Sequence, residues 1–439
     1  MTRQELKDRC CKAIDARADG LIADARALRD MPEPGYREHK TSAYVKARLE
    51  QAGLRVQDGL GLTGLKARAP GGKSLFNVAL VGELDSLLLP GHPHADPVTG
   101  AAHACGHYTS LVCMLGALFG LLDSGVLSEL DGDVSFIAAP AEEIIEFSYR
   151  DALRQSGKIA YFGGKQELIR LGALDDVDVA VCSHISHHGT PFYRCGNRSN
   201  GVLNKQARFI GRAAHAAGSP ELGVNALHAA VSAINNINAL RDRFRDDDHV
   251  RVHYIVTKGG DTPNIVPDDV RLEMGVRASS TERMLEAAAL VDQALRSGAE
   301  AIGAKVEITN LGAYLPMHQH QGLSRLFLEN AAALIGQQNV LDTAAVVSTG
   351  STDAGDLAAF RPTIHPYFGG SKGALHTVDV VVTNERFVYV DACKAYACTV
   401  IDLLAGQAAA CRKIVDSYQP EFATKEDYCA FCDKLYGVQ

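Results

Sequence analysis

The residues best suited to chemistry are a cysteine and a histidine two positions apart. Cys105 and His107 stand in "HACGHYTS", shortly before an uncharged apolar run from Leu111 to Leu122 that predicts a buried helix. The unpaired N–H groups and the positive dipole at a helix start stabilise a thiolate, and side chains two apart can converge on one ion. A buried cysteine beside an unrelated histidine is the alternative.

A pair of adjacent carboxylates forms the second group. "PAEE" places Glu142 and Glu143 at the carboxyl end of a predicted strand, where an open α/β sheet usually carries its site. Neighbouring carboxylates are costly to bury unless a metal neutralises one and the other exchanges a proton. The pair therefore indicates one ligand and one general base, with a solvated acidic loop as the alternative.

Two further histidines extend this set. His184 ends a predicted strand in "VCSHISHHG", and His376 lies in the glycine-rich "GGSKGALHTVD", where backbone can approach an ion closely. A single histidine is more often packed or solvated than metal-bound. Five possible donors at loop and strand ends, namely one cysteine, one glutamate and three histidines, together predict a metal site. The mixture of soft and hard donors suits zinc, manganese, cobalt, iron or nickel without choosing among them.

The elements that must position these side chains alternate between short apolar strands and helices. Strands predicted at 76–84, 133–140 and 178–185 favour an α/β fold with a mostly parallel central sheet covered by helices. Between 200 and 311 the predicted order becomes βαββαβ, the ferredoxin-like unit. We expect residues 1–199 and 312–439 to form the catalytic domain around an inserted domain at 200–311.

Bulk properties agree with a two-domain globular protein of 439 residues. The net charge of −8 argues against a nucleic-acid partner, and no apolar run is long enough to span a membrane. The charged start "MTRQELKDRC" lacks a secretory signal, and the 11 cysteines then favour reduced thiols and a cytoplasmic location. Cys429 and Cys432 form a CxxC without a second pair nearby and receive no role.

Six ordered motifs resemble one family of enzymes. They are "MPEPGYREHKTSAYV", "HACGH", "PAEE", "GRAAHAAGSPELGVNALHA", "GGDTPNIVPD" and "GSTDAGD". Together they resemble the aminoacylase and carboxypeptidase-type metallohydrolases, especially the amidohydrolase branch that includes aminobenzoyl-glutamate and N-acyl amino acid hydrolases. The resemblance extends from about Leu28 to Ala405.

The resemblance implies a role for each matching residue. One or two divalent ions, with manganese and zinc first, would be held by Cys105, His107, Glu143, His184 and His376. Glu142 matches the general base, and Cys105 is a plausible bridge between two ions. The inserted lid domain of the family dimerises through its sheet, which implies a homodimer.

The resemblance also assigns residues in the inserted domain. His215 resembles the histidine that reaches a neighbouring active site to stabilise the oxyanion, although a structural contact would look the same. Asn264 and Arg277 resemble the substrate-binding pair, and a guanidinium suits a substrate carboxylate.

Two features depart from the family pattern. Tyr108 replaces the usual aspartate after "HACGH" and could bind substrate or simply pack against the sheet. The segment "IIEFSYRDALRQSGKIAYF" after Glu143 could bring Tyr149, Arg150 or Tyr161 to the substrate, or form a surface helix.

The expected function is hydrolysis of a C–N bond in a small carboxylate-bearing molecule by metal-activated water. The leading hypothesis is amide cleavage of an N-acyl amino acid or aminobenzoyl-type substrate. The alternative is hydrolytic deamination of an electron-poor aromatic amine, as in the nitroanthranilate aminohydrolase of the same superfamily, which would release ammonia. Tyr108 and the segment after Glu143 motivate that alternative, because a flat ring needs an altered pocket. A binding protein without turnover is a third reading, weakened by the presence of every proposed catalytic residue.

Overall fold

The computed structural model describes residues 1–438, which form two compact units. Unit 1 comprises Met1–Asn197, His318–Val346 and Asp356–Lys425. Unit 2 comprises Arg198–Met317, Val347–Gly355 and a segment that begins at Glu426. The expected boundaries of the inserted domain, residues 200 and 311, lie close to the two ends of the range Arg198–Met317. The segments that begin at 347 and 426, expected in the catalytic domain, belong instead to unit 2.

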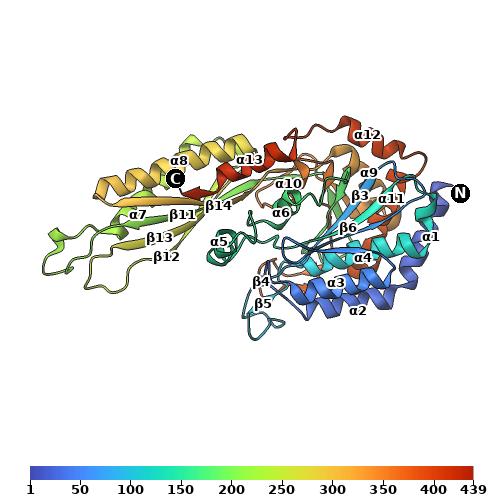
Figure 1. Ribbon diagram of the computed structural model, residues 1–439, viewed down its shortest axis with the longest axis horizontal. Helices are drawn as coiled ribbons and strands as arrows, with labels where there is room; N and C mark the ends of the chain where they lie inside the picture. Colours follow the sequence, from blue (N-terminus) through green and yellow to red (C-terminus); the bar gives the residue numbers. More distant parts are fainter. Residues whose placement is uncertain (439) are drawn as a thin grey trace. The chain divides into compact units, whose positions relative to one another are not determined.

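Unit 1 is built on a six-stranded sheet with the order β1-β2-β6-β3-β7-β18. The strands are β1 (Val56–Leu60), β2 (Gly64–Ala69), β3 (Asn77–Glu83), β6 (Asp133–Ala139), β7 (Val179–Val181) and β18 (Thr363–Ile364). β6, β3, β7 and β18 are parallel, whereas β1 and β2 form an antiparallel edge. β3 and β6 are buried at every position, as expected for strands covered on both faces. The predicted α/β fold with a mostly parallel central sheet is confirmed (Figure 1).

Helices pack on this sheet and on one another. They are α1 (Arg3–Ala16), α2 (Ala18–Arg29), α3 (His39–Gln51), α4 (His107–Asp123), α5 (Phe147–Gln155), α6 (Gly164–Arg170), α9 (Gln321–Ile335), α10 (Ala354–Ala358), α11 (Ala392–Leu404) and α12 (Ala409–Ser417). The apolar run predicted as a helix lies within α4, which is buried along nearly its whole length against β3. α1 and α11 pack on α4, so the core of unit 1 continues from the sheet into this helical layer.

The strand predicted at 178–185 is divided in the structure. β7 pairs with β18, whereas β8 (His184–Ile185) pairs with β19 (Tyr367–Phe368) in a second sheet with the order β16-β9-β19-β8. The other two strands of this sheet are β9 (Tyr193–Cys195) and β16 (Val340–Asp342). The change of partner carries His184 beyond the carboxyl end of the central sheet. Short hairpins complete unit 1 at β4 (Leu87–Leu88) with β5 (Ala101–Ala102) and β20 (Ser371–Lys372) with β21 (Val381–Val382).

Unit 2 has the predicted βαββαβ order. Its elements are β11 (Gly201–Ile210), α7 (Ala226–Ala239), β12 (Arg251–Lys258), β13 (Asp269–Ala278), α8 (Thr281–Ile302), β14 (Lys305–Tyr314), the C-terminal helix α13 (Lys425–Leu435) and β22 (Gly437–Val438). The antiparallel sheet has the order β12-β13-β11-β14-β22, so the C-terminal β22 adds a strand that the sequence did not predict. α7 and α8 pack together on this sheet (Figure 1).

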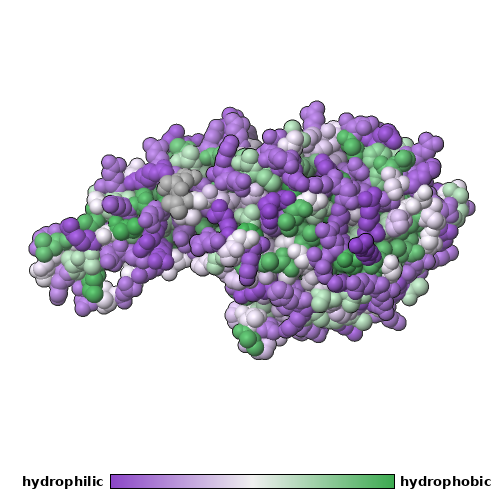
Figure 2. Space-filling model, viewed as in Figure 1, coloured by the Kyte–Doolittle hydropathy of each residue, from purple (hydrophilic) through white to green (hydrophobic). Residues whose placement is uncertain are grey.

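The surface of unit 2 includes an unpaired edge. β12 ends the strand order, and its side chains Ile255 and Val256 are 62% and 50% exposed. Figure 2 shows hydrophilic residues over most of the face in view, with hydrophobic residues in scattered patches on both units, including the end of unit 2 that carries the loop between β12 and β13. Among residues 1–438, we find no helix with the length and apolar character that a membrane crossing requires.

A buried ion pair inside unit 2 generates a stability prediction. Lys205 Nζ on β11 lies 2.8 Å from Asp292 Oδ1 on α8 and donates to Asn310 Oδ1 at 2.8 Å, with Lys205 only 1% exposed. Lys205→Met leaves the Asp292 carboxylate buried without its cation, and should lower the free energy of unfolding by about 3 kcal/mol. Denaturant titration measures this loss.

The matched control is Arg208→Met on the same strand, whose partners Asp269 and Glu307 are partly exposed and which should change stability little. Adding Asp292→Leu to Lys205→Met should recover most of the loss. A single variant as stable as the parent would contradict the role of this ion pair.

Candidate metal centre

The candidate donors gather at one edge of the central sheet. β3 ends at Glu83, β6 is followed by Glu142 and Glu143, and β7 is followed by His184. Because these strands are parallel, their carboxyl ends meet at the same edge. Acidic and imidazole side chains far apart in the sequence therefore share one place.

The start of α4 contributes Cys105 and His107. Gly106 between them has a φ of 87°, in the left-handed region that favours glycine, and is the N-cap of α4. A Cβ at this position would lie 2.6 Å from Ile185 Cγ2, which is too close for any side chain. The glycine thus permits a sharp turn that directs both neighbours to the sheet edge.

The described residues form four groups of candidate donor atoms; two of them contain Glu142, and the other two share the Cys105 sulfur. Of the two that share the sulfur, one is Cys105, His107 and His184, and the other is Cys105, Glu143 and His376, with the ligand atoms of each group within 4.8 Å of one another. Cys105 Sγ lies 3.3 Å from His184 Nε2 and 3.3 Å from His376 Nε2. All five predicted ligands therefore come together, in two triads with a common thiol.

Hydrogen bonds orient the imidazoles of the first triad. His107 Nδ1 lies 3.0 Å from Asp85 Oδ1, and His184 Nδ1 donates to the Ile185 carbonyl at 2.6 Å. These acceptors hold the proton on Nδ1 and leave Nε2 free, which is the arrangement of metal-binding histidines. His107 Nε2 is buried without a hydrogen-bond partner among residues 1–438. The donor set and this buried nitrogen both fit a divalent transition metal.

The two anionic donors are ionised, as metal ligands are, whereas the imidazolium of His376 would have to lose a proton to bind a metal. Burial raises the pKa of the Cys105 thiol, but His107 and His184 outweigh it and lower that pKa to about 6. Burial likewise raises the pKa of Glu143, but the hydrogen bond from His376 lowers it to about 2. The bonds to Cys105 and Glu143 raise the pKa of His376 to about 10. Thiolate and carboxylate are thus already ionised and balanced by imidazolium.

Two carboxylates face His107 from outside the triads. Glu142 is 8% exposed, and its Oε2 lies 3.7 Å from His107 Nε2. Glu83 Oε2 lies 3.5 Å from the same nitrogen, while its Oε1 accepts a hydrogen bond of 2.7 Å from Lys165. Lys165 is completely buried and fixes Glu83.

The loop that carries Glu142 and Glu143 is braced from two sides. Ala141 has a φ of 49°, and its N–H donates to the buried Glu38 Oε1 at 2.7 Å. From the other side, Arg150 on α5 donates to the carbonyls of Glu143 and Phe162. Arg150 is 1% exposed and lies over the Tyr36 ring. The segment after Glu143 thus supports the loop from behind.

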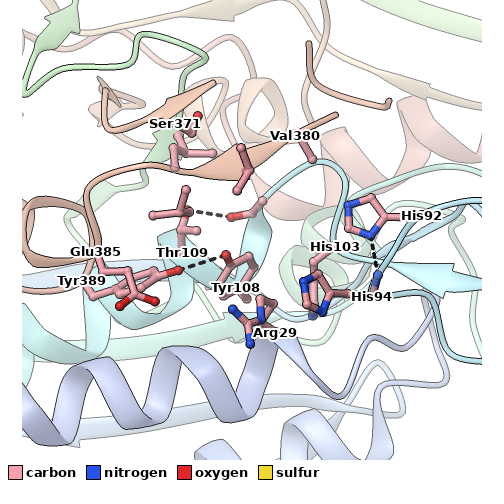
Figure 3. Close-up of a pocket in the computed structure, with 14 residues that line it drawn as sticks. Arg29, His92, His94, His103, Tyr108, Thr109, Ser371, Val380, Glu385 and Tyr389 are labelled. Carbon is pink, nitrogen blue, oxygen red and sulfur yellow. Dashed lines mark hydrogen bonds between the residues drawn. The ribbon is translucent and has the colours of Figure 1, made fainter. Parts of the chain in front are cut away.

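Tyr108 lies in a different place from the two triads. It is 5% exposed, and its hydroxyl is 3.1 Å from that of Tyr389. Figure 3 shows Tyr108 and Tyr389 in a small pocket that also contains Arg29 and His103, and that encloses about 80 Å³. His184 belongs to the first triad, whereas the next residue of β8, Ile185, lines this pocket. Successive side chains of a strand point to opposite sides, so β8 separates the pocket from the triad.

Three predicted site residues belong to unit 2 and not to the unit that carries the triads. His215 is exposed, and its Nδ1 accepts hydrogen bonds from Ala217 and Gly218. Asn264 is exposed in the neighbouring loop, where its carbonyl accepts from Ala216 at 3.0 Å. Arg277 on β13 is half-buried and donates to Ser351 Oγ at 2.8 Å.

Several functional candidates escaped sequence reasoning. Asp85 orients His107 and also accepts the Glu143 N–H at 2.9 Å, so it joins the two triads from behind. His365 is buried with its ring 5.9 Å from that of His184. Asp85 follows the apolar strand that ends at Glu83, and this polar strand end was a usable signal. Lys165 carried none, because its partner Glu83 is distant in the sequence. Arg150 was named as a possible substrate contact, but it donates to backbone carbonyls instead.

Comparison with known proteins shows which family the chain is similar to. Residues 198–302 match the peptidase dimerisation domain. The chain is 30% identical to the Xaa-Arg dipeptidase of Homo sapiens over 91% of its own length and 89% of that protein. It is 29% identical to the Xaa-Arg dipeptidase of Mus musculus over 97% of its length and 92% of the relative.

Solved structures share the fold. A dinuclear metal-binding peptidase of the M20 family from Bacillus subtilis has a TM-score of 0.65 at 20% identity, covering 89% of this chain and 99% of that one. The aminobenzoyl-glutamate utilization protein of Klebsiella pneumoniae also has a TM-score of 0.65, at 19% identity over 89% and 97% of the two chains.

The shared sulfur generates a prediction about metal stoichiometry. Cys105→Ala removes a donor from both triads and should deplete all bound metal, because each remaining pair is a weak site. His376→Ala removes a donor from one triad only and should leave about half of the metal that the parent binds. Elemental analysis of purified protein after loading with manganese or zinc measures both. Unchanged metal in the Cys105 variant would exclude the thiol as a ligand.

Proposed function

Because the chain belongs to the M20 family of metal-dependent, amide-cleaving hydrolases, we propose that it hydrolyses a small N-acyl amino acid or aminobenzoyl-type substrate that bears a carboxylate. The observation that carries this proposal is the pair of donor triads sharing Cys105, with the Glu142 carboxylate 3.7 Å from a donor of the first triad. The activity named for the dipeptidase relatives supports an amide bond next to a free carboxylate.

The five donors Cys105, His107, Glu143, His184 and His376 would hold one or two divalent ions, with zinc and manganese the first candidates. Such ions polarise a bound carbonyl and lower the pKa of water toward neutrality. Asp85 would keep His107 turned toward the ion, and the ionised Cys105 and Glu143 would receive it without first losing protons.

Glu142 is the proposed general base and acid. Its carboxylate takes a proton from the attacking water and later gives that proton to the departing amine nitrogen. The brace of Glu38 and Arg150 limits the motion of the loop that carries it. A base held in place needs little reorganisation between the two transfers, which is the condition for efficient proton exchange.

Unit 2 would supply the remaining contacts. We assign His215 to the developing oxyanion, and Asn264 with Arg277 to the substrate, where the guanidinium would pair with the carboxylate. The exposed edge strand β12, with Ile255 and Val256, supports assembly of a homodimer through this unit. His215 would then act on the active site of the neighbouring subunit.

The aromatic-amine alternative loses the arguments that motivated it. Tyr108 is hydrogen-bonded in a separate pocket, and Arg150 donates to backbone carbonyls behind the Glu142 loop. Neither residue supports a slot for a flat ring at the triads. Amide cleavage is therefore the function we retain, and ammonia release without a carboxylic acid remains the assay result that would favour deamination.

Glu142→Gln separates base function from metal binding. The variant should hold as much metal as the parent, because Glu142 belongs to neither triad that shares Cys105, while kcat falls by about 10²- to 10⁴-fold. Product analysis of acyl amino acid and aminobenzoyl substrates, with amines, carboxylic acids and ammonia measured separately, gives the rates. Turnover near that of the parent would remove Glu142 from the mechanism.

A mixture of two inactive variants tests the origin of His215. His215→Ala and Glu142→Gln should each be nearly inactive, but mixed dimers should regain activity because one of their sites has both residues. Activity is measured after subunit exchange and compared with that of each variant alone. If the mixture stays as inactive as its components, His215 does not act on the partner's site.

A further inference from the structure

Helix α11 carries two cysteines, and each meets a cysteine of another helix. Cys398 Sγ lies 3.7 Å from Cys11 Sγ on α1. Cys393, five residues earlier, neighbours Cys113 on α4 and donates to the Tyr389 carbonyl at 3.4 Å. Neither pair belongs to the metal centre, and the proposed function uses neither.

The first pair is held in register by ion pairs on both sides. Lys7 and Asp402 lie 2.6 Å apart, and Asp15 and Lys394 lie 2.7 Å apart. Lys7 and Asp15 are each four residues from Cys11, and Asp402 and Lys394 are each four residues from Cys398. Residues four apart lie on one helix face, so α1 and α11 run antiparallel with three matched contacts in a row. The two thiols are the middle contact.

The two thiol pairs differ in access to water. Cys11 is partly exposed, whereas Cys398 is 2% exposed behind it. Cys113 and Cys393 are both completely buried in the core between α4 and α11. A water-borne reagent can therefore reach Cys11 directly but cannot reach the inner pair without opening the core.

The charges around the two pairs also differ. The hydrogen bond with Cys398 lowers the pKa of Cys11, and Lys394 adds to this effect against burial and the carboxylates of Asp15 and Asp8. Burial holds the pKa of Cys113 well above its ordinary value. The thiolate is the nucleophilic form of cysteine, and the lowered pKa favours it at Cys11.

We propose that Cys11 and Cys398 form an oxidation site, at which a hydroperoxide converts the two thiols to a disulfide that ties α1 to α11. The Cys11 thiolate attacks the peroxide, the O–O bond breaks, and Cys11 becomes a sulfenic acid as one oxygen leaves as hydroxide or alkoxide. The Cys398 sulfur then bonds to the Cys11 sulfur, and the sulfenic oxygen leaves as water. Closing the bond requires the sulfurs to move from 3.7 Å to about 2.05 Å, a side-chain adjustment.

Peptide mapping of the full-length, metal-loaded protein tests this site. The protein carries Cys10→Ser, so that the buried neighbour Cys10 cannot be confused with Cys11 in a peptide. After treatment with hydrogen peroxide and alkylation of the remaining thiols, we expect a peptide joined through Cys11 and Cys398, lighter by two hydrogens. Cys113 and Cys393 are the matched control and should be fully alkylated once the protein is unfolded.

Two variants examine the order of the steps. Cys398→Ser should stop at the sulfenic acid on Cys11, which dimedone traps, whereas Cys11→Ser should leave Cys398 reduced. Lys394→Gln should slow the oxidation of Cys11 several-fold at neutral pH. The proposal is overturned if no Cys11–Cys398 peptide forms, or if the inner pair is oxidised as fast as the outer one. The test reads the mass of a cross-linked peptide and needs no enzyme activity. Failure of the proposed function would leave its result unchanged, because neither Cys11 nor Cys398 belongs to the metal centre.

Discussion

The rest of unit 1 is organised around the need to keep several ionisable groups together in a buried place. The Cys105 thiolate and the carboxylates of Glu142 and Glu83 are buried beside the imidazoles of His107 and His184, whereas Glu143 is partly buried and His376 is exposed. Burying like charges costs several kcal/mol unless opposite charge lies beside them. Imidazolium and the buried Lys165 supply part of that charge, and the donor geometry fits divalent cations for the remainder.

The fold meets this need through elements that are themselves rigid. Parallel strands bring Glu83, Glu142 and His184 to one edge, and the glycine turn before α4 adds Cys105. Behind these donors lies a layer that fixes their direction. Asp85 links His107 to the backbone of Glu143, and Arg150 holds the carbonyl of the same residue. A ligand set held this way loses little entropy when it binds an ion.

The sequence predicted the donors better than their supports. Cys105, His107 and Glu143 stand in short motifs at the ends of apolar runs, and their chemistry is visible locally. His376 and His184 were recoverable because glycine and strand ends mark them. Lys165 and Arg150 were not, because a buried cation is recognised only by its partners, and those lie far away or are backbone carbonyls. Tyr108 was ambiguous, since adjacent helix residues point in different directions and sequence alone did not reveal which one faced the ion.

In the fold, strong periodicity predicted the central sheet and the βαββαβ unit, whereas two features depended on tertiary pairing. One is the change of sheet between β7 and β8, and the other is the added strand β22.

The central claim is that one sulfur joins two metal positions. Anomalous diffraction from a zinc-loaded crystal tests it most directly. We predict two peaks, each about 2.3 Å from Cys105 Sγ. Ions bound without contact to that sulfur would contradict the account.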